Sequence, residues 1–342
     1  MRIRTMSLAA LAVALLAACA GPAATPTPAP TAAPTAAPTA QPTVAPTLSP
    51  ADLGPIRIGV EAPGGEAYIA VQLTVKQLKA EGYDIEMIMF EDPDIMPQAL
   101  DAGDININTN SSGQILSAVD AGLDVKAITG LTNPDFVMVA DKDHPTCASL
   151  DGAKIGAQGT TGFGFASVTN WLERDCPEAQ PEMLDIPGSE NRAVALLEGQ
   201  INATSLHLLR ALQLQQVEPG NFVIIDGYGS GPGVTSAWQY SLTSWIDANP
   251  QLYTAYVQTY QEVVDAIEAN PQLAVDEGLA TIPDAPADLV TQVMQEWAAN
   301  DTWTAGDGIT REVFDATLAF YLEFTEYEKD LTYEMVILPP PQ

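Results

Sequence analysis

A short stretch of this sequence occurs twice. Residues 99–108 read ALDAGDININ and residues 195–203 read ALLEGQINA, so an Ala-Leu pair, a glycine and an Ile-Asn pair recur at matching places. Internal repeats constrain a fold strongly, because each copy has to form the same local structure. The two copies therefore predict two similar units within one chain.

The distance from each copy to the apolar run before it is nearly the same. The first copy follows IRIGV and the second follows AKIGA, and both runs have the composition of a short buried strand. The interval is 44 positions from Gly59 to Gly103 and 43 positions from Gly156 to Gly199. The repeat thus covers a whole strand-and-helix unit rather than a single turn.

Apolar runs typical of strands alternate with helical patterns, as in an α/β fold with largely parallel sheets. From Ile246 onward the pattern is almost wholly helical and is interrupted at two Asn-Pro pairs. The predicted strands are IRIGVEA, IEMIMFE, DININ, VKAIT, FVMVA, KIGAQ, INATS, FVIID and VTSAWQYSLT.

The simplest topology inserts the second unit into the first. Lobe 1 then comprises residues 55–143 and the mostly helical residues 235–342, and lobe 2 comprises residues 144–234. Two chain crossings, near 140–150 and 230–238, would join the lobes. Two crossings restrict motion to a hinge, which suits closure around a ligand in the cleft between the lobes.

The N-terminus predicts export. Arg2 and Arg4 precede the apolar run LAALAVALLAA, which is too short to span a bilayer. Leu16-Ala17-Ala18-Cys19 resembles a bacterial lipobox, in which the cysteine is diacylated after cleavage. We therefore expect a lipoprotein signal peptide over 1–18. The alternative is a plain signal peptide with an incidental cysteine.

A tether follows the predicted lipid anchor at Cys19. Residues 19–50 are almost wholly Pro, Ala and Thr, a composition that cannot bury a core and favours extended polyproline II structure. We expect the folded part to be anchored by lipid to the extracytoplasmic face of the cell membrane.

Charge excludes several partners. The sequence has 13 Lys and Arg against 44 Asp and Glu, a formal net charge of −31. This argues against nucleic acid and anionic membrane surfaces as partners. No other segment is apolar and long enough to span a membrane, and we expect a monomer.

Cysteine and histidine are scarce. Outside the cytoplasm, Cys147 and Cys176 would form a possible disulfide, and two separate buried thiols are the alternative. The only two histidines, His144 and His207, have no ligand-like spacing to the cysteines. We expect no metal and no cofactor, and His207 has the pattern of a helix-face residue.

With signal, lipobox, tether and two lobes together, the chain resembles the type II extracytoplasmic solute-binding proteins of ABC importers. That family includes riboflavin, thiamine-pyrimidine-precursor, taurine, sulfonate and nitrate binders. The resemblance implies the two-lobed periplasmic-binding-protein fold, a small-molecule ligand, and a permease with its ATPase as partner. It is carried by GGEAYIAVQ at 64–72, ALDAGDINI at 99–107, LDGAKIGA at 150–157, ALLEGQINA at 195–203 and Asn249-Pro250.

The sequence departs from this family at one repeated position. The family often has Asp where this chain has Asn106 and Asn202. Because both asparagines recur in the two lobes, we interpret them as structural.

Ligands of open α/β sheets bind beyond the carboxyl ends of the strands. Four loops satisfy this rule, and each also has an ordinary interpretation as a turn or a helix cap. Arg192 and Trp238 lie near them, with core packing the alternative for Trp238. The loop candidates are Gly64, Gly65 and Tyr68, then Asn110 and Ser111, then Thr160, Thr161 and Phe163, and finally Asp226 and Tyr228.

The candidate loops are rich in aromatic residues and poor in cations. A sulfonate or nitrate site would need more charge-assisted donors. We therefore expect a neutral heteroaromatic ligand, with riboflavin first and a thiamine pyrimidine precursor second. No nucleophile paired with a base is evident, so we do not expect an enzyme. A ligand-sensing or adhesion surface lipoprotein remains the alternative of another class.

Overall fold

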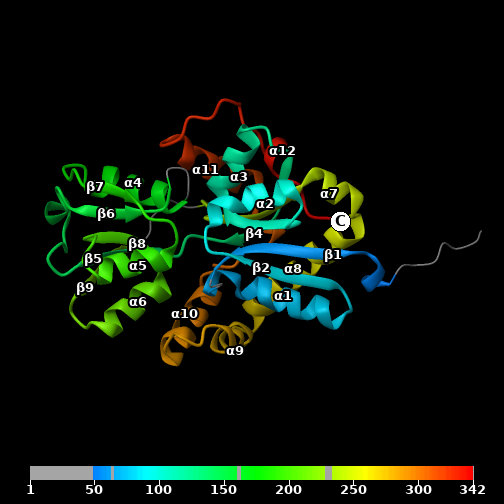
Figure 1. Cartoon of the computed structure of the whole chain (residues 1–342), viewed down its shortest axis with the longest axis horizontal. Coiled ribbons are helices and arrows are strands. Elements are labelled where there is room, and N and C mark those ends of the chain that lie inside the picture. Colours follow the sequence, from blue (N-terminus) through cyan, green and yellow to red (C-terminus); the bar gives the residue numbers. More distant parts are fainter. Residues whose placement is uncertain (1–48, 63–64, 160–162, 228–232, 342) are drawn as a thin grey trace, which may run out of the picture. The chain divides into compact units, whose positions relative to one another are not determined.

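The computed structural model describes residues 49–62, 65–159, 163–227 and 233–341 (Figure 1). The chain from Thr47 to Gln342 forms one compact unit. Within the described residues, helices are too short or too polar to cross a bilayer.

Two five-stranded sheets organise the fold. The first has the order β2-β1-β3-β10-β4 and the second the order β7-β6-β8-β5-β9. The strands of the first are β1 (Pro55–Glu61), β2 (Asp84–Phe90), β3 (Ile107–Ser111), β4 (Val125–Thr132) and β10 (Ala237–Leu242). Those of the second are β5 (Phe136–Asp141), β6 (Lys154–Ala157), β7 (Glu182–Asp185), β8 (Ala203–His207) and β9 (Phe222–Gly227).

The two sheets have the same connectivity. In each, the second strand pairs in parallel with two neighbours: β1 with β2 and β3, and β6 with β7 and β8. In each, the fourth strand, β10 or β5, is antiparallel to both of its neighbours. The α/β class is confirmed, and each sheet is largely parallel, with four of its five strands running in one direction. The fourth strand runs in the opposite direction. It follows directly after the last strand of the other sheet, since β5 follows β4 and β10 follows β9.

One boundary of the lobe division needs correction. Strand β5 lies in the second sheet, whereas the sequence analysis placed residues 55–143 in lobe 1. The chain leaves the first sheet between Thr132 and Phe136 and returns between β9 and β10. Hydrophobic pattern alone does not tell which sheet a strand joins, and this caused the error.

Helices cover both faces of the first sheet (Figure 1). One apolar cluster packs α1 (Ile69–Ala80), α8 (Pro250–Ala269), α9 (Gln272–Thr281) and α10 (Ala287–Ala299) against one face. The other cluster involves α2 (Met96–Ala102), α3 (Ser112–Asp120), α11 (Arg311–Leu322) and α12 (Tyr333–Val336). Helix α7 (Thr243–Ala248) follows β10.

The second sheet has a similar cover. Helices α5 (Ser189–Leu197) and α6 (Leu208–Val217) enclose one cluster, and α4 (Phe163–Asp175) encloses the other. Five short 3₁₀ turns complete the described elements: η1 (Pro50–Asp52), η2 (Glu66–Tyr68), η3 (Pro93–Ile95), η4 (Cys147–Leu150) and η5 (Gly306–Gly308). A disulfide joins Cys147 in η4 to Cys176, just after α4.

The repeated motif has the same structural task in both units. Gly103 and Gly199 end a helix with positive φ of 79° and 69°, which glycine adopts without strain. The side chain of Asn106 accepts a hydrogen bond from the Arg57 backbone N–H at 2.8 Å. Asn202 accepts the equivalent bond from Lys154 at 2.9 Å. Asn106 therefore fixes the start of β3 to β1, and Asn202 fixes the start of β8 to β6.

Candidate functional site

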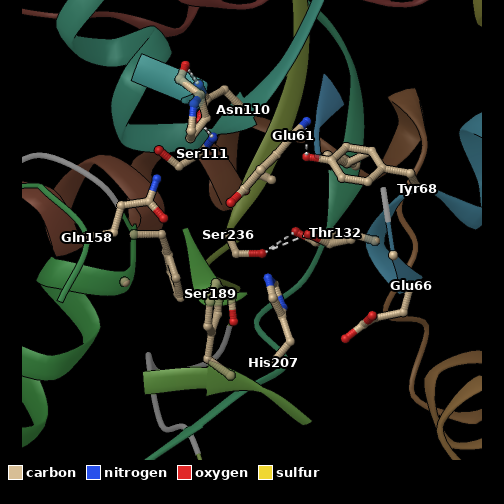
Figure 2. Close-up of a pocket in the computed structure, with 18 of the residues that line it drawn as sticks. Glu61, Glu66, Tyr68, Asn110, Ser111, Thr132, Gln158, Ser189, His207 and Ser236 are labelled. Carbon is tan, nitrogen blue, oxygen red and sulfur yellow. Dashed lines mark hydrogen bonds between the residues drawn. The ribbon is translucent and has the colours of Figure 1, made fainter. Parts of the chain in front are cut away.

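A pocket lies at the carboxyl ends of strands from both sheets (Figure 2). From the first sheet, β1, β3 and β4 deliver Glu61, Ser111 and Thr132. From the second, β8 delivers His207, and the loop after β6 delivers Gln158. The strand-end rule for open α/β sheets thus places the pocket where the sequence analysis looked for it.

Tyr68 and Asn110 line the pocket but also hold its wall together. The Tyr68 hydroxyl accepts a hydrogen bond from the Glu61 backbone N–H at 3.2 Å. Burial, with the nearby charge of Glu61, raises the pKa of Tyr68 far above its usual range. The Asn110 amide donates to the Pro93 carbonyl at 3.1 Å and accepts from the Ser111 N–H at 2.7 Å. Both side chains are therefore held rigidly by their neighbours.

An aromatic surface forms another wall of the pocket. The ring of Phe136 stacks on the imidazole of His207, with centroids 4.1 Å apart. Phe136 also stacks on Phe163, with ring centroids 5.8 Å apart. Phe163 in turn stacks on Phe320, with centroids 5.5 Å apart. Such a surface suits a flat ring in an offset stack.

His207 is held by a carboxylate. Its Nδ1 lies 2.8 and 2.9 Å from the two carboxylate oxygens of Asp135. Burial alone would lower the pKa of His207, but the charge and hydrogen bond of Asp135, with Glu66 and Glu61 nearby, raise it to about 9. The imidazole is therefore protonated at neutral pH.

Two further carboxylates reach the pocket from the turn after β1. Glu66 is buried, with 8% of its surface exposed, and Glu61 is partly buried. Burial raises the pKa of each above the usual range, although the charges of His207 and, for Glu61, Arg192 oppose the shift. Two acidic side chains without an ion-pair partner among the described residues therefore line the pocket.

The two arginines of the lining already bond to protein atoms. Arg192, 1% exposed, donates to the carbonyl oxygens of Ser205 and Ile186, both at 3.2 Å. Arg210 forms an ion pair with Glu190. Arg192 thus lines the pocket, and its guanidinium group holds backbone carbonyls of the wall in place.

Glu66, Asp135 and His207 form a group that could hold a metal ion. Each offers one ligand atom, and these atoms lie within 4.8 Å of one another. Histidine and carboxylate are ordinary ligands of divalent cations. The spacing of histidine to cysteine does not reveal this group, because its other two members are carboxylates from distant segments.

Most of the described candidates line the pocket, but one does not. Trp238 is fully buried and its ring packs on Phe314 with centroids 6.5 Å apart, so its ligand role was wrong and core packing holds. The predicted site residues that line the pocket are Gly65, Tyr68, Asn110, Ser111, Phe163 and Arg192.

Other candidates fall outside the described residues. Asp226 belongs to the backbone of β9, but its side chain lies outside what the structure describes. Five other candidates lie wholly outside the described residues: Cys19, Gly64, Thr160, Thr161 and Tyr228.

The sequence analysis missed Glu61, Glu66, Phe136 and His207. The interpretation of His207 as a helix-face residue was wrong, since it ends β8 and caps α6. The repeat in the sequence could have identified His207. When its two copies are aligned on their glycines, His207 matches Ser111, which ends β3 and caps α3.

Comparison with protein-family profiles identifies the family. A family profile described as "NMT1/THI5 like" matches residues 78–274, more than half of the chain. The chain belongs to the NMT1/THI5-like family. A search among curated proteins finds no match.

Solved structures show the same fold at low identity. A ligand-binding component of an ABC-type import system from Staphylococcus aureus, solved with zinc bound, superposes with a TM-score of 0.70 at 15% identity, covering 83% of this chain and 96% of that one. The alkanesulfonate-binding protein SsuA from Xanthomonas axonopodis, bound to MOPS, gives 0.64 at 18%, covering 82% and 97%. The nitrate-binding protein NrtA from Synechocystis gives 0.60 at 11%, covering 70% and 69%. This family member thus has the two-lobed periplasmic-binding-protein fold.

Proposed function

We propose that this chain is the solute-binding component of an ABC importer and captures a small molecule in the pocket between its two sheets. The observation that carries the proposal is the pocket itself, built from strand ends of both sheets in a fold shared with import components. A ligand that contacts both sheets favours the state in which they are held together, which a permease can recognise.

The lining suits a flat heteroaromatic solute. The Phe136–His207 stack offers a face for the ring, and Ser111, Thr132 and Gln158 offer polar atoms around it. Riboflavin and a thiamine pyrimidine precursor remain the first two ligands to test. A sulfonate or nitrate is the alternative.

The same proposal includes the predicted anchor and the absence of turnover. A lipid at Cys19 and the Pro/Ala/Thr tether would keep the monomeric folded part at the extracytoplasmic face of the membrane, near the permease. The binding protein would release its solute unchanged to the permease.

A thermal-shift screen of residues 47–342 tests the proposal. A solute that binds only the folded state raises the melting temperature by mass action. We expect a shift with a member of a panel of riboflavin, pyrimidines, taurine, alkanesulfonates and nitrate. No shift with any small molecule, together with a stable protein partner, would instead support a sensor or adhesion role.

A pair of variants locates the site. Phe136→Leu keeps an apolar side chain but removes the ring that stacks on His207, so it should weaken binding about tenfold. Phe324→Leu is the matched control, because Phe324 packs on Phe320 outside the pocket lining. Equal affinity in both variants would place the solute elsewhere.

A further inference from the structure

The carboxylates of Glu61 and Glu66 are the least satisfied charges of the pocket. The Ser189 backbone N–H lowers the pKa of Glu61, and the backbone N–H of Glu66 lowers the pKa of its own carboxyl group. Neither forms an ion pair with a side chain that the structure describes. In Figure 2, Glu61 extends into the pocket from the first sheet and His207 from the second.

The positive groups nearby are already engaged. His207 is paired with Asp135, Arg210 is paired with Glu190, and Arg192 donates to backbone carbonyls. Three carboxyl groups, those of Asp135, Glu66 and Glu61, lie near the one imidazole. The charge of Arg192 also acts on Glu61 and that of Arg210 on Glu66. Among the described side chains around the pocket, the acidic ones, Glu61, Glu66, Asp135 and Glu190, outnumber the basic ones, Arg192, His207 and Arg210.

A carboxylate buried without a cation costs free energy of folding. Charges arranged at such a cost are typical of sites where a ligand supplies the missing partner. The aromatic rings of Phe136 and Phe163 lie on the same pocket and favour the face of a ring or a cation.

We propose, on the basis of the solute-binding function above, that the solute is an organic cation of the amine or amidine class, whose N–H groups donate to the carboxylates of Glu61 and Glu66. This narrows the flat heteroaromatic solute proposed above to one that carries a cationic nitrogen, in place of the neutral ligand expected from the sequence. An anion such as sulfonate or nitrate would meet carboxylates instead of free donors in this region.

Three probes of nearly equal shape test the charge preference: benzamidine, benzamide and benzoate. Binding to residues 47–342 is measured by calorimetry and thermal shift, with EDTA present. We expect benzamidine to bind at least about tenfold more tightly than benzamide, because a charge-assisted hydrogen bond is worth about twice a neutral one. Benzoate should bind most weakly.

Glutamine variants assign the preference to the two carboxylates. Glu61→Gln and Glu66→Gln should each reduce benzamidine affinity about tenfold and leave benzamide affinity unchanged. Glu312→Gln, an exposed position on α11, makes the same charge change and should keep the preference.

Other outcomes overturn the inference in distinguishable ways. Preference for benzamide or benzoate, or benzamidine binding unaffected by both variants, rejects the cationic solute but keeps the solute-binding function. Stabilisation by Zn²⁺ without EDTA and by no organic probe assigns the carboxylates to a metal instead. Failure of these probes and of the whole solute panel rejects the solute-binding function together with the inference.

Discussion

His207 links the stability of the pocket to pH. Its pKa in the folded chain is about 9, above the ordinary value of 6.5, because Asp135, Glu66 and Glu61 outweigh the effect of burial. A raised pKa gives stability that is fully present below about 6.5 and is lost as pH rises through about 9. The protonated state of His207 therefore stabilises the folded chain at neutral pH.

We predict that His207→Gln loses on the order of 3 kcal/mol of unfolding free energy near pH 6 and that this deficit shrinks toward pH 9.5. Urea unfolding of both proteins across this range measures the difference. A deficit that does not change with pH would show that the residue acts through packing on Phe136 alone.

The two repeated asparagines have different surroundings despite their shared role. Asn202 donates from its amide to Asp141 at 3.1 Å, in addition to accepting from Lys154. Asn202→Asp would place two carboxylates together, and we expect a loss of about 1–2 kcal/mol in unfolding free energy. Asn106→Asp keeps the accepting oxygen for Arg57 and should cost less than about 1 kcal/mol. Equal losses in urea unfolding would contradict this assignment.

Strand β4 approaches the chain before η5 closely, and glycine permits it. A Cβ at Gly130 would lie 2.8 Å from the backbone oxygen of Thr304 and 2.9 Å from its carbonyl carbon. Gly130→Ala should therefore destabilise the protein by about 2–4 kcal/mol. Gly308→Ala meets the same Thr304 at an ordinary 3.4 Å and serves as the control. Similar melting temperatures for the two variants would mean that the strand can shift.

The disulfide joins η4 to the end of α4, beside an apolar cluster of the second sheet. It closes a loop with a sequence separation of 29 residues. In the chain-entropy model, a bond that closes a loop of this size raises the free energy of unfolding by about 3–4 kcal/mol. Cys147→Ser should lose that amount in urea unfolding, and a reducing agent should lower wild-type stability but not that of the variant. A wild type insensitive to reduction would contradict a stabilising bond.

The sequence predicted the fold well where a pattern repeats. Gly103, Gly199, Asn106 and Asn202 have the paired structural roles expected of two similar units. Strands β5 and β10 were predicted, but their antiparallel direction was not, because strand direction depends on pairing between residues far apart in the chain. Local pattern carries no such information.

The pocket was predictable in position and only partly in chemistry. The strand-end rule found Tyr68, Ser111 and Phe163, which follow apolar strands directly. It was not applied to the strand ending at His207, whose charge depends on Asp135 from another segment. A titratable group's environment is assembled by the tertiary fold, so the acidic lining of the pocket could not be derived from composition.

The central claim for the whole molecule is that one solute is held between strand ends of both sheets. A crystal structure of residues 47–342 with the most stabilising solute tests it most directly. We predict the solute against Phe136 and His207 of the second sheet, with a nitrogen of the solute beside Glu61 of the first. A solute bound outside this pocket, or touching only one sheet, would contradict the account.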